Sequence, residues 1–232
     1  MIPRIIHQTW KDRNVPERFL DAQRSWQEAH PDWEYRFWTD EDLAALVRER
    51  APELVPLYEA YPEAIQRVDA ARYVILREFG GVYADLDLLC LRPIDALLES
   101  EVVLPRTTPF GVSNQFMLSV KGHSLFCHAV ASLPRAYGKW GKVWPRHLRI
   151  LTTAGPLFLT GRLREHGTRY GMRLLTLEEH GHGDPAAAYV GHLRGNTWAG
   201  WDTHVINLFH DNWKWLAAGA AITAVLVRIL LF

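Results

Sequence analysis

Two aspartates one residue apart, Asp85 and Asp87, have the side chains in this sequence that best suit metal-assisted chemistry. They follow the short β-prone run 82–84, which we expect to be a buried strand. In an extended chain, residues two apart point to the same side, with Cα atoms about 6.6–6.8 Å apart. The two carboxylates could share one hard cation, Mn²⁺ or Mg²⁺, whose open positions would carry a diphosphate. Aspartates are also common in solvated turns, so the pair alone does not establish a metal site.

A second charged pair, Asp69 and Arg72, lies on a predicted helix over 64–79 that precedes the aspartates. Residues three apart share one face of a helix. In solvent such a pair would be a weak surface ion pair. Because this helix is largely apolar and leads through Gly80 and Gly81 into the predicted strand, we expect the pair to be fixed beside the metal site. There both groups could hold sugar hydroxyls.

The run 64–95, AIQRVDAARYVILREFGGVYADLDLLCLRPID, closely resembles the DXD-containing sugar-binding region of glycosyltransferase family 32. Its combination of D-x-x-R with G-G-x-Y-x-D-x-D is far more specific than the aspartates alone. The resemblance implies a GT-A type α/β fold, in which helices flank a mostly parallel central sheet. It also implies a nucleotide-sugar site at the C-terminal ends of the strands, Mn²⁺ or Mg²⁺ as cofactor, and retention of configuration at the transferred sugar. The catalytic set by this resemblance is Asp69, Arg72, Asp85 and Asp87.

The N-terminal run 2–10, IPRIIHQTW, is predicted to be the first strand of the sheet. Open α/β sheets bind ligands at the carboxyl ends of their strands, and His7, Gln8, Thr9 and Trp10 fall at that end. The family's very similar I-P-x-I-I-H-Q-x-W implies that these residues lie against the donor nucleotide. From the strand alone, a structural histidine and a core tryptophan remain the alternative.

Three more residues are candidates for the donor site. Tyr83 belongs to the G-G-x-Y pattern, and Asn114 matches the family pattern S-N-x-x-x-x-S. An asparagine before a strand is also ordinary turn chemistry. By resemblance Asp40 could approach the nucleotide, although its place at the start of a predicted helix already explains it.

The run 191–201, GHLRGNTWAGW, resembles the family's C-terminal H-x-x-G-S-x-W pattern. The resemblance implies that His192 approaches the metal or the diphosphate. It also implies that Asn196 and Trp198 contact the diphosphate and close the pocket, although Asn196 stands where serine is usual. Two other histidines compete for the metal, His204 and His210.

The C-terminal segment 212–232 is predicted to be a hydrophobic helix. Residues 213–232 as a helix would be about 30 Å long, enough to cross a hydrocarbon core. Tryptophans and a lysine at its start suit a membrane interface, and Arg228 near its end could reach one. We therefore expect a GT-A catalytic domain over 1–211 and a membrane anchor over 212–232. A membrane-surface or oligomerising helix is the alternative.

The composition bears on the partners, the cysteine chemistry and the location expected for this protein. Basic and acidic residues balance at 26 each, which argues against a nucleic-acid partner. The chain has two cysteines, Cys90 and Cys127, both expected to be buried thiols without zinc-site spacing. The N-terminus begins with a strand-like run and shows no signal peptide. We expect a membrane-associated protein, at the Golgi or endomembranes in a eukaryote and at the inner membrane in a bacterium.

The sequence thus predicts a metal-dependent retaining glycosyltransferase that moves a hexose from a nucleotide sugar to a hydroxyl. The expected acceptor is lipid-linked or membrane-presented, such as an inositol-phosphoceramide-like glycolipid. GDP-mannose is the first expectation for the donor, and a UDP-hexose remains open. We expect front-face transfer, in which the leaving phosphate helps to deprotonate the acceptor.

Two alternatives stay open. A D-x-D-x-T/V phosphatase also places paired aspartates after a buried strand, but usually the first strand, and here Leu89 replaces the Thr or Val. A non-catalytic, membrane-tethered sugar-binding subunit is the other alternative.

Overall fold

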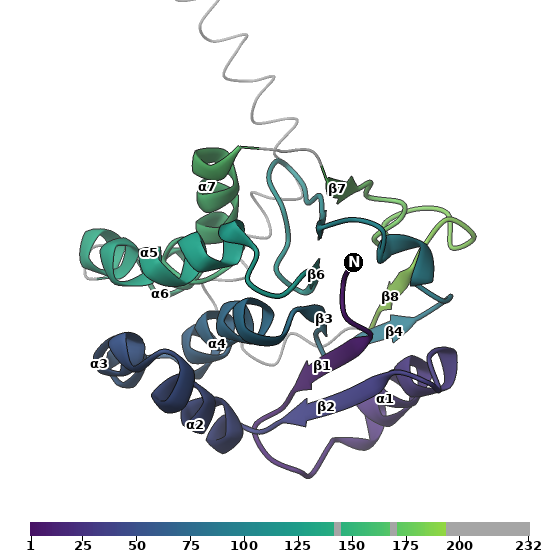
Figure 1. Cartoon of the computed structure of the whole chain (residues 1–232), viewed down its shortest axis with the longest axis horizontal. Helices are drawn as coiled ribbons and strands as arrows, with labels where there is room; N and C mark the ends of the chain where they lie inside the picture. The colour runs from purple at the N-terminus through teal and green to yellow at the C-terminus, as the bar shows by residue number, and fades with distance from the viewer. Residues whose placement is uncertain (142–144, 168–170, 194–232) are drawn as a thin grey trace, which may run out of the picture.

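The computed structural model describes residues 1–141, 145–167 and 171–193 (Figure 1). Its strands are Ile5–Thr9 (β1), Glu34–Trp38 (β2), Gly81–Ala84 (β3), Leu88–Cys90 (β4), Val102–Pro105 (β5), Phe116–Ser119 (β6), Met172–Leu175 (β7) and Val190–His192 (β8). Its helices are Glu17–Ala29 (α1), Asp40–Arg50 (α2), Val55–Ala60 (α3), Ala64–Phe79 (α4), Ser124–Trp140 (α5), Arg146–Thr153 (α6) and Pro156–His166 (α7). Short 3-10 turns cover Pro52–Leu54 and Asp95–Leu97.

The centre of the fold is a six-stranded sheet in the order β2-β1-β3-β6-β5-β7. β6 runs antiparallel to both of its neighbours, whereas the other adjacent strands are parallel. The sheet is therefore mixed, and the expected mostly parallel order is interrupted by β6. A separate antiparallel ribbon joins β4 to β8.

The sheet separates two hydrophobic cores. Along β3, Tyr83 packs into the core beneath α2, α4, α5 and α7, whereas Val82 and Ala84 pack into the opposite core. This alternation follows from the two-residue period of a strand. The second core is covered by α1 and the β4–β8 ribbon, which Trp26 joins by donating from Nε1 to the carbonyl of Leu88 at 2.8 Å. Figure 1 shows α2 to α7 on one side of the sheet and α1 with the ribbon on the other.

A glycine pair connects the buried helix α4 to β3. Gly80 and Gly81 have φ angles of 66° and 86°, in the region that favours glycine. A Cβ on Gly81 would lie 2.5 Å from the carbonyl oxygen of Ile5, and one on Gly80 would lie 2.6 Å from the amide nitrogen of Lys121. The pair therefore lets the chain reverse tightly against β1 and the end of β6, which brings α4 and the aspartates together.

The segment 85–87 is a turn, so the extended geometry expected for it is wrong. The amide of Leu88 donates to the carbonyl of Asp85 at 3.1 Å, which closes the turn between β3 and β4. The amide of Asp85 donates to the carbonyl of Gln115 at 2.8 Å and fixes the turn to the start of β6. Leu86 and Leu88 are buried, at 3% and 0% exposure.

Some of the predicted residues and elements lie outside the described part of the chain. Asn196, Trp198 and the predicted helix over 212–232 lie outside the described residues, as do His204 and His210. Within the described ranges, no helix combines the length and apolar character needed to cross a membrane. Cys90 is a buried free thiol as expected, whereas Cys127 is free but exposed on α5, so the expectation of burial was wrong there.

Candidate active site

A cleft of about 520 Å³ opens beside the turn that carries the two aspartates, and we call it the DXD cleft. It is bounded by the end of β1, the starts of α1 and α2, one face of α4, and the turn itself. The residues that line it are Thr9, Trp10, Lys11, Phe19, Asp40, Ala64, Ile65, Val68, Arg72, Asp85, Leu86, Asp87 and Gln115. The carboxyl end of β1 and the α4–β3 unit therefore meet at one site.

A buried charge network joins three of the four predicted catalytic residues. Arg72 places Nη2 at 3.0 Å from Oδ1 of Asp69 and Nη1 at 3.3 Å from Oδ1 of Asp85. The side chains of Arg72 and Asp69 are 2% and 5% exposed, which excludes a surface ion pair. The guanidinium also lies 4.6 Å from the centre of the Tyr83 ring. Arg72 thus connects the helix to the DXD turn, and the contact of Asp69 and Arg72 with sugar hydroxyls stays a prediction.

Burial has the largest single effect on the pKa values of Asp69 and Arg72. Desolvation raises the pKa of Asp69 to about 6, although Arg72 opposes the rise. Desolvation alone would lower the pKa of Arg72, but the charges of Asp85, Tyr83 and Asp69 raise it, so the guanidinium stays charged. The network is a fixed positive charge enclosed by carboxylates.

The two DXD carboxylates suit a divalent cation. Asp85 accepts from Tyr83 Oη at 2.9 Å through Oδ1, the same oxygen that faces Arg72, so Oδ2 is the oxygen left for a ligand. Desolvation raises the pKa of Asp87 to about 6, and the charge of Asp85 makes the second-largest contribution. Burial likewise raises the pKa of Asp85. Two desolvated carboxylates that repel each other form the oxygen donor set that Mg²⁺ or Mn²⁺ binds.

The strand-end residues divide into two groups. Thr9 and Trp10 line the DXD cleft, whereas His7 and Gln8 are fully buried. His7 accepts from Trp38 Nε1 at 3.2 Å through Nδ1, so its Nε2 donates to the carbonyl of Gly80 at 3.0 Å. Burial lowers the pKa of His7 to about 3. This neutral histidine uses both ring nitrogens inside the protein and does not reach the cleft.

Gln8, Tyr83 and Asn114 act on their neighbours in this structure. Gln8 donates to the carbonyl of Asp85 at 3.4 Å, and Tyr83 bridges Thr9 and Asp85 through its hydroxyl. Asn114 is 4% exposed and donates from Nδ2 to Asp69 at 3.0 Å. These side chains position the DXD turn and the charge network. Direct contact of any of them with a donor stays a prediction.

Other residues of the cleft carry no motif. Lys11, Phe19 and Gln115 line it, and only the position of Lys11 just after the first strand could have indicated this. Phe19 packs edge-on against Trp10 with ring centres 5.4 Å apart. The Nε1 of Trp10 is buried without a hydrogen-bond partner among the described residues. Because buried polar atoms usually have a partner, Trp10 Nε1 is a candidate contact for a ligand of the cleft.

His192 lies on β8, opposite Leu88, in the ribbon that begins directly after Asp87. Its Nε2 lies 2.7 Å from the carbonyl of His180, which accepts from it. Burial raises the pKa of Asp85, and Arg72, Tyr83 and, least of the three, the nearby His192 oppose that rise. His192 is therefore close to the DXD turn, and its contact with a metal there stays a prediction.

The fold and the cleft define a class of protein. The chain overlays the structure titled PaToxG glycosyltransferase with a TM-score of 0.57 at 16% identity, over 71% of this chain and 70% of that one. It overlays the UDP-bound glycosyltransferase domain of the YGT toxin with a TM-score of 0.55 at 10% identity, over 75% and 79%. The fold is that of a GT-A-like glycosyltransferase with a mixed central sheet.

Sequence similarity places the chain more narrowly. Residues 16–104 match the family described as the glycosyltransferase sugar-binding region containing DXD motif. The chain is 34% identical over 217 residues to inositol phosphoceramide mannosyltransferase 1 of Schizosaccharomyces pombe, covering 92% of this chain and 67% of that protein. The chain belongs to this DXD-containing glycosyltransferase family.

Two further relatives match over a shorter part. Inositol phosphoceramide mannosyltransferase 3 of S. pombe is 42% identical over 68% of this chain and 44% of its own length. Mannosyl phosphorylinositol ceramide synthase SUR1 of Saccharomyces cerevisiae is 41% identical over 69% of this chain and 41% of its own length. The chain thus spans less than half of these two relatives.

Proposed function

We propose that this chain transfers mannose from GDP-mannose to a hydroxyl of an inositol-phosphoceramide-like glycolipid, with retention of configuration. The observation that carries the proposal is the DXD cleft, where Asp85 and Asp87 meet the buried Arg72 within the segment that matches the family. The sugar and the acceptor are inferred from the activities for which the relatives are named.

In this proposal Asp85 and Asp87 hold Mn²⁺ or Mg²⁺. The bound ion would neutralise the diphosphate leaving group. Tyr83 and Arg72 hold Asp85 through Oδ1, so that its other oxygen is presented to the ion. Arg72 adds a fixed positive charge at the wall of the cleft and orients the donor, and Asp69 keeps that guanidinium in place. His192 could become a third ligand if its ring left the carbonyl of His180.

The donor nucleotide would lie at the end of β1. Thr9 and Trp10 face the cleft there, and the Nε1 of Trp10 can donate to an oxygen of the nucleotide. Lys11 beside them would attract the diphosphate. Asn196 and Trp198 would close this part of the cleft, as the resemblance implies.

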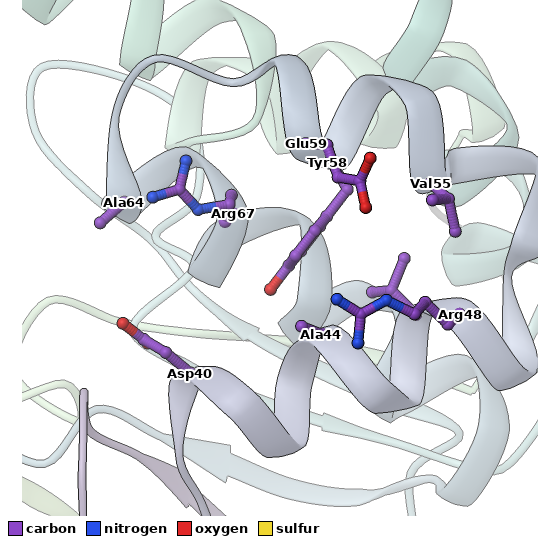
Figure 2. A pocket seen from close by; sticks show the side chains of 9 residues that line it. Asp40, Ala44, Arg48, Val55, Tyr58, Glu59, Ala64 and Arg67 are labelled. Carbon is purple, nitrogen blue, oxygen red and sulfur yellow. The ribbon is translucent and has the colours of Figure 1, made fainter.

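A second pocket, of about 260 Å³, lies between α2, α3 and α4 and shares Asp40 and Ala64 with the DXD cleft. Figure 2 shows the Tyr58 hydroxyl pointing into the space between Asp40 and Arg48. Arg67 also lines this pocket, so that the guanidinium groups of Arg48 and Arg67 share it with the carboxylates of Asp40 and Glu59. We propose that an acceptor headgroup with a phosphate and hydroxyls binds here, because arginine pairs well with phosphate and carboxylates accept hydrogen bonds from hydroxyls.

Residues 212–232 would hold the catalytic domain at the membrane that contains the acceptor. Their predicted helix is long enough to cross a hydrocarbon core. Removal of 212–232 should release the protein from vesicles while nucleotide release from the donor persists. Retained vesicle binding after this removal would contradict the proposed anchor.

The test is a donor panel with purified protein and Mn²⁺. GDP-mannose, UDP-glucose, UDP-galactose and UDP-GlcNAc are each incubated with and without EDTA, and nucleotide release is recorded. We expect EDTA-sensitive release from GDP-mannose, lost in Asp87→Asn and kept in Asp32→Asn, an exposed aspartate outside the cleft. Release from a UDP-hexose alone would keep the glycosyltransferase and change its sugar.

Two outcomes would favour the alternatives. Release of phosphate from a phosphomonoester that requires Asp87, without transfer from any donor, would indicate a phosphatase. Calorimetric binding of a donor without release would indicate a sugar-binding subunit. Addition of inositol phosphoceramide in vesicles then tests the acceptor, because transfer should yield a mannosylated lipid.

A further inference from the structure

Three histidines meet at the end of the β4–β8 ribbon. His180 and His182 lie in the turn before β8, and His192 ends β8. One ligand atom from each lies within 4.8 Å of the other two. The ring centres are 5.3 Å apart for His180 and His182, 4.8 Å for His180 and His192, and 4.6 Å for His182 and His192.

These separations fit a shared transition metal ion. Zinc bound at about 2.0–2.1 Å in tetrahedral geometry places the centres of two imidazole rings about 5 Å apart. The observed values bracket this separation. The rings are therefore close enough for one ion to be shared, and binding would require the side chains to turn so that their nitrogens converge on it.

Among the described residues, the side chain of His180 has no hydrogen-bond partner. It is 1% exposed, and both of its ring nitrogens are buried without a hydrogen-bond partner among the described residues. Leaving a buried polar group unpaired is unfavourable, so such a group usually has a partner. The ring meets His192 edge to face, with an angle of 87° between the planes. His180 thus contacts both of the other rings and has both ring nitrogens left for a ligand.

The backbone holds the cluster in place. Gly181, between His180 and His182, has a φ angle of 84°, and a Cβ there would lie 2.3 Å from the carbonyl oxygen of Val190. Only a glycine lets this turn approach β8 so closely. Thr176 and Glu179 close the turn with reciprocal bonds between side chain and backbone, at 2.8 and 3.1 Å.

His192 has the hydrogen bond that metal-binding histidines usually make. Its Nε2 donates to the carbonyl of His180 at 2.7 Å, which leaves the lone pair on Nδ1 as the ligand. A backbone carbonyl in this role fixes the tautomer and the ring orientation. We propose that His180, His182 and His192 bind a Zn²⁺ ion, with water at the fourth position.

This site differs in chemistry from the DXD pair. Imidazole ligands suit Zn²⁺, Cu²⁺, Ni²⁺ and Co²⁺, whereas carboxylates suit Mg²⁺ and Mn²⁺. The zinc would attach the turn to β8, whose partner β4 starts directly after Asp87. One imidazole lone pair cannot serve both metals, so zinc at this site would prevent His192 from joining the ion of the proposed function.

The test uses Zn²⁺ and Co²⁺ with the full chain after removal of metal by a chelator. An Asp87→Asn background weakens the carboxylate site, so that its contribution is small. We expect one equivalent of Zn²⁺ by calorimetry and, with Co²⁺, the strong visible absorption of a four-coordinate ion. His182 is exposed, so His182→Ala should leave the fold intact and weaken Zn²⁺ binding by ~10–100-fold or more.

The control is His128→Ala, which removes an exposed histidine that pairs with Glu165 on the surface, far along the chain. It should bind Zn²⁺ as the background does. Equal Zn²⁺ affinity with and without His182, or no Co²⁺ absorption in a folded protein, would overturn the proposal. These measurements need no donor or acceptor, so they are independent of the transferase assay.

Discussion

Replacement of the second DXD aspartate, Asp87→Asn, should abolish transfer and at the same time stabilise the metal-free protein. The pKa of Asp87 rises from 3.8 to about 6 on folding, mainly by desolvation and then by the charge of Asp85. The folded state therefore holds the proton more tightly than the unfolded state, so ionisation of this carboxyl opposes folding. The penalty is absent well below pH 3.8 and complete above about pH 6. The difference of about 2.2 in pKa corresponds to about 3 kcal/mol as an upper value.

Asparagine keeps the shape of Asp87 and removes the charge. It still has to be desolvated, so we expect a gain in unfolding free energy of about 1–2 kcal/mol at pH 7.5. The change of this stability difference with pH is a stronger test than its value at a single pH. Between pH 7.5 and pH 4.5 the penalty for the wild-type carboxyl falls by about 2 kcal/mol, so the advantage of Asp87→Asn should disappear over that range.

Urea unfolding in EDTA at the two pH values measures this difference, with Asp32→Asn as the exposed control that should change stability by less than about 0.5 kcal/mol. Added Mn²⁺ should then stabilise the wild type, by about 2.7 kcal/mol at one hundred times its Kd, and leave Asp87→Asn unchanged. A less stable Asp87→Asn, or a difference that is the same at both pH values, would refute the reasoning. Asp87 would then be a structural residue with hydrogen bonds of its own.

Four further outcomes follow from the same structure. Arg72→Met should lower the unfolding free energy by about 3–5 kcal/mol because it leaves Asp69 and Asp85 without their cation, and a loss below about 1 kcal/mol in urea unfolding would contradict the network. Gly81→Ala should cost at least about 2 kcal/mol through its positive φ and the close carbonyl, whereas Gly161→Ala, with open space in α7, should stabilise by up to about 1 kcal/mol. Trp10→Phe should raise the KM for the donor by up to about tenfold with unchanged stability, and an unchanged KM would remove Trp10 Nε1 from the donor site. Calorimetric affinity for Mn²⁺ should fall about tenfold from pH 7 to pH 5, since Asp87 must lose its proton near pH 6 to bind the ion; a flat profile would exclude it as a ligand.

The local part of the site could be predicted from the sequence. The helical period of 64–79, the glycine pair and the short apolar run specify α4 and β3 within one continuous segment. The spacing of Asp69 and Arg72 places both on one helix face, which the structure confirms. Such features depend on neighbours within a few residues, so the pattern in the sequence contains them.

The role of His7 could not be found in that way. Its partners are the Trp38 ring and the Gly80 carbonyl, 31 and 73 residues away along the chain. They approach only because β2 and β3 pair on either side of β1. A motif places a histidine at the end of a strand, but only the sheet decides which nitrogen atoms are already used.

The β4–β8 ribbon is the part of the site that is hardest to predict from the sequence. Its register pairs Leu88 with His192 and Cys90 with Val190, across about one hundred residues. Each strand has three residues, too few for a period to be recognised. The turn at 85–87 could not be predicted for the same reason, because it leads the chain from the central sheet into this ribbon.

The carboxylates at the cleft carry more negative charge than the neighbouring arginine neutralises. Asp69, Asp85 and Asp87 all have raised pKa values even though Arg72 lies among them. One buried guanidinium therefore does not compensate three partly or fully desolvated carboxylates. A divalent cation with a diphosphate would remove the repulsion between Asp85 and Asp87 and add little net charge. The fold thus keeps these carboxylates at a cost in stability that ligand binding would relieve, which is the state that the Asp87→Asn experiment measures.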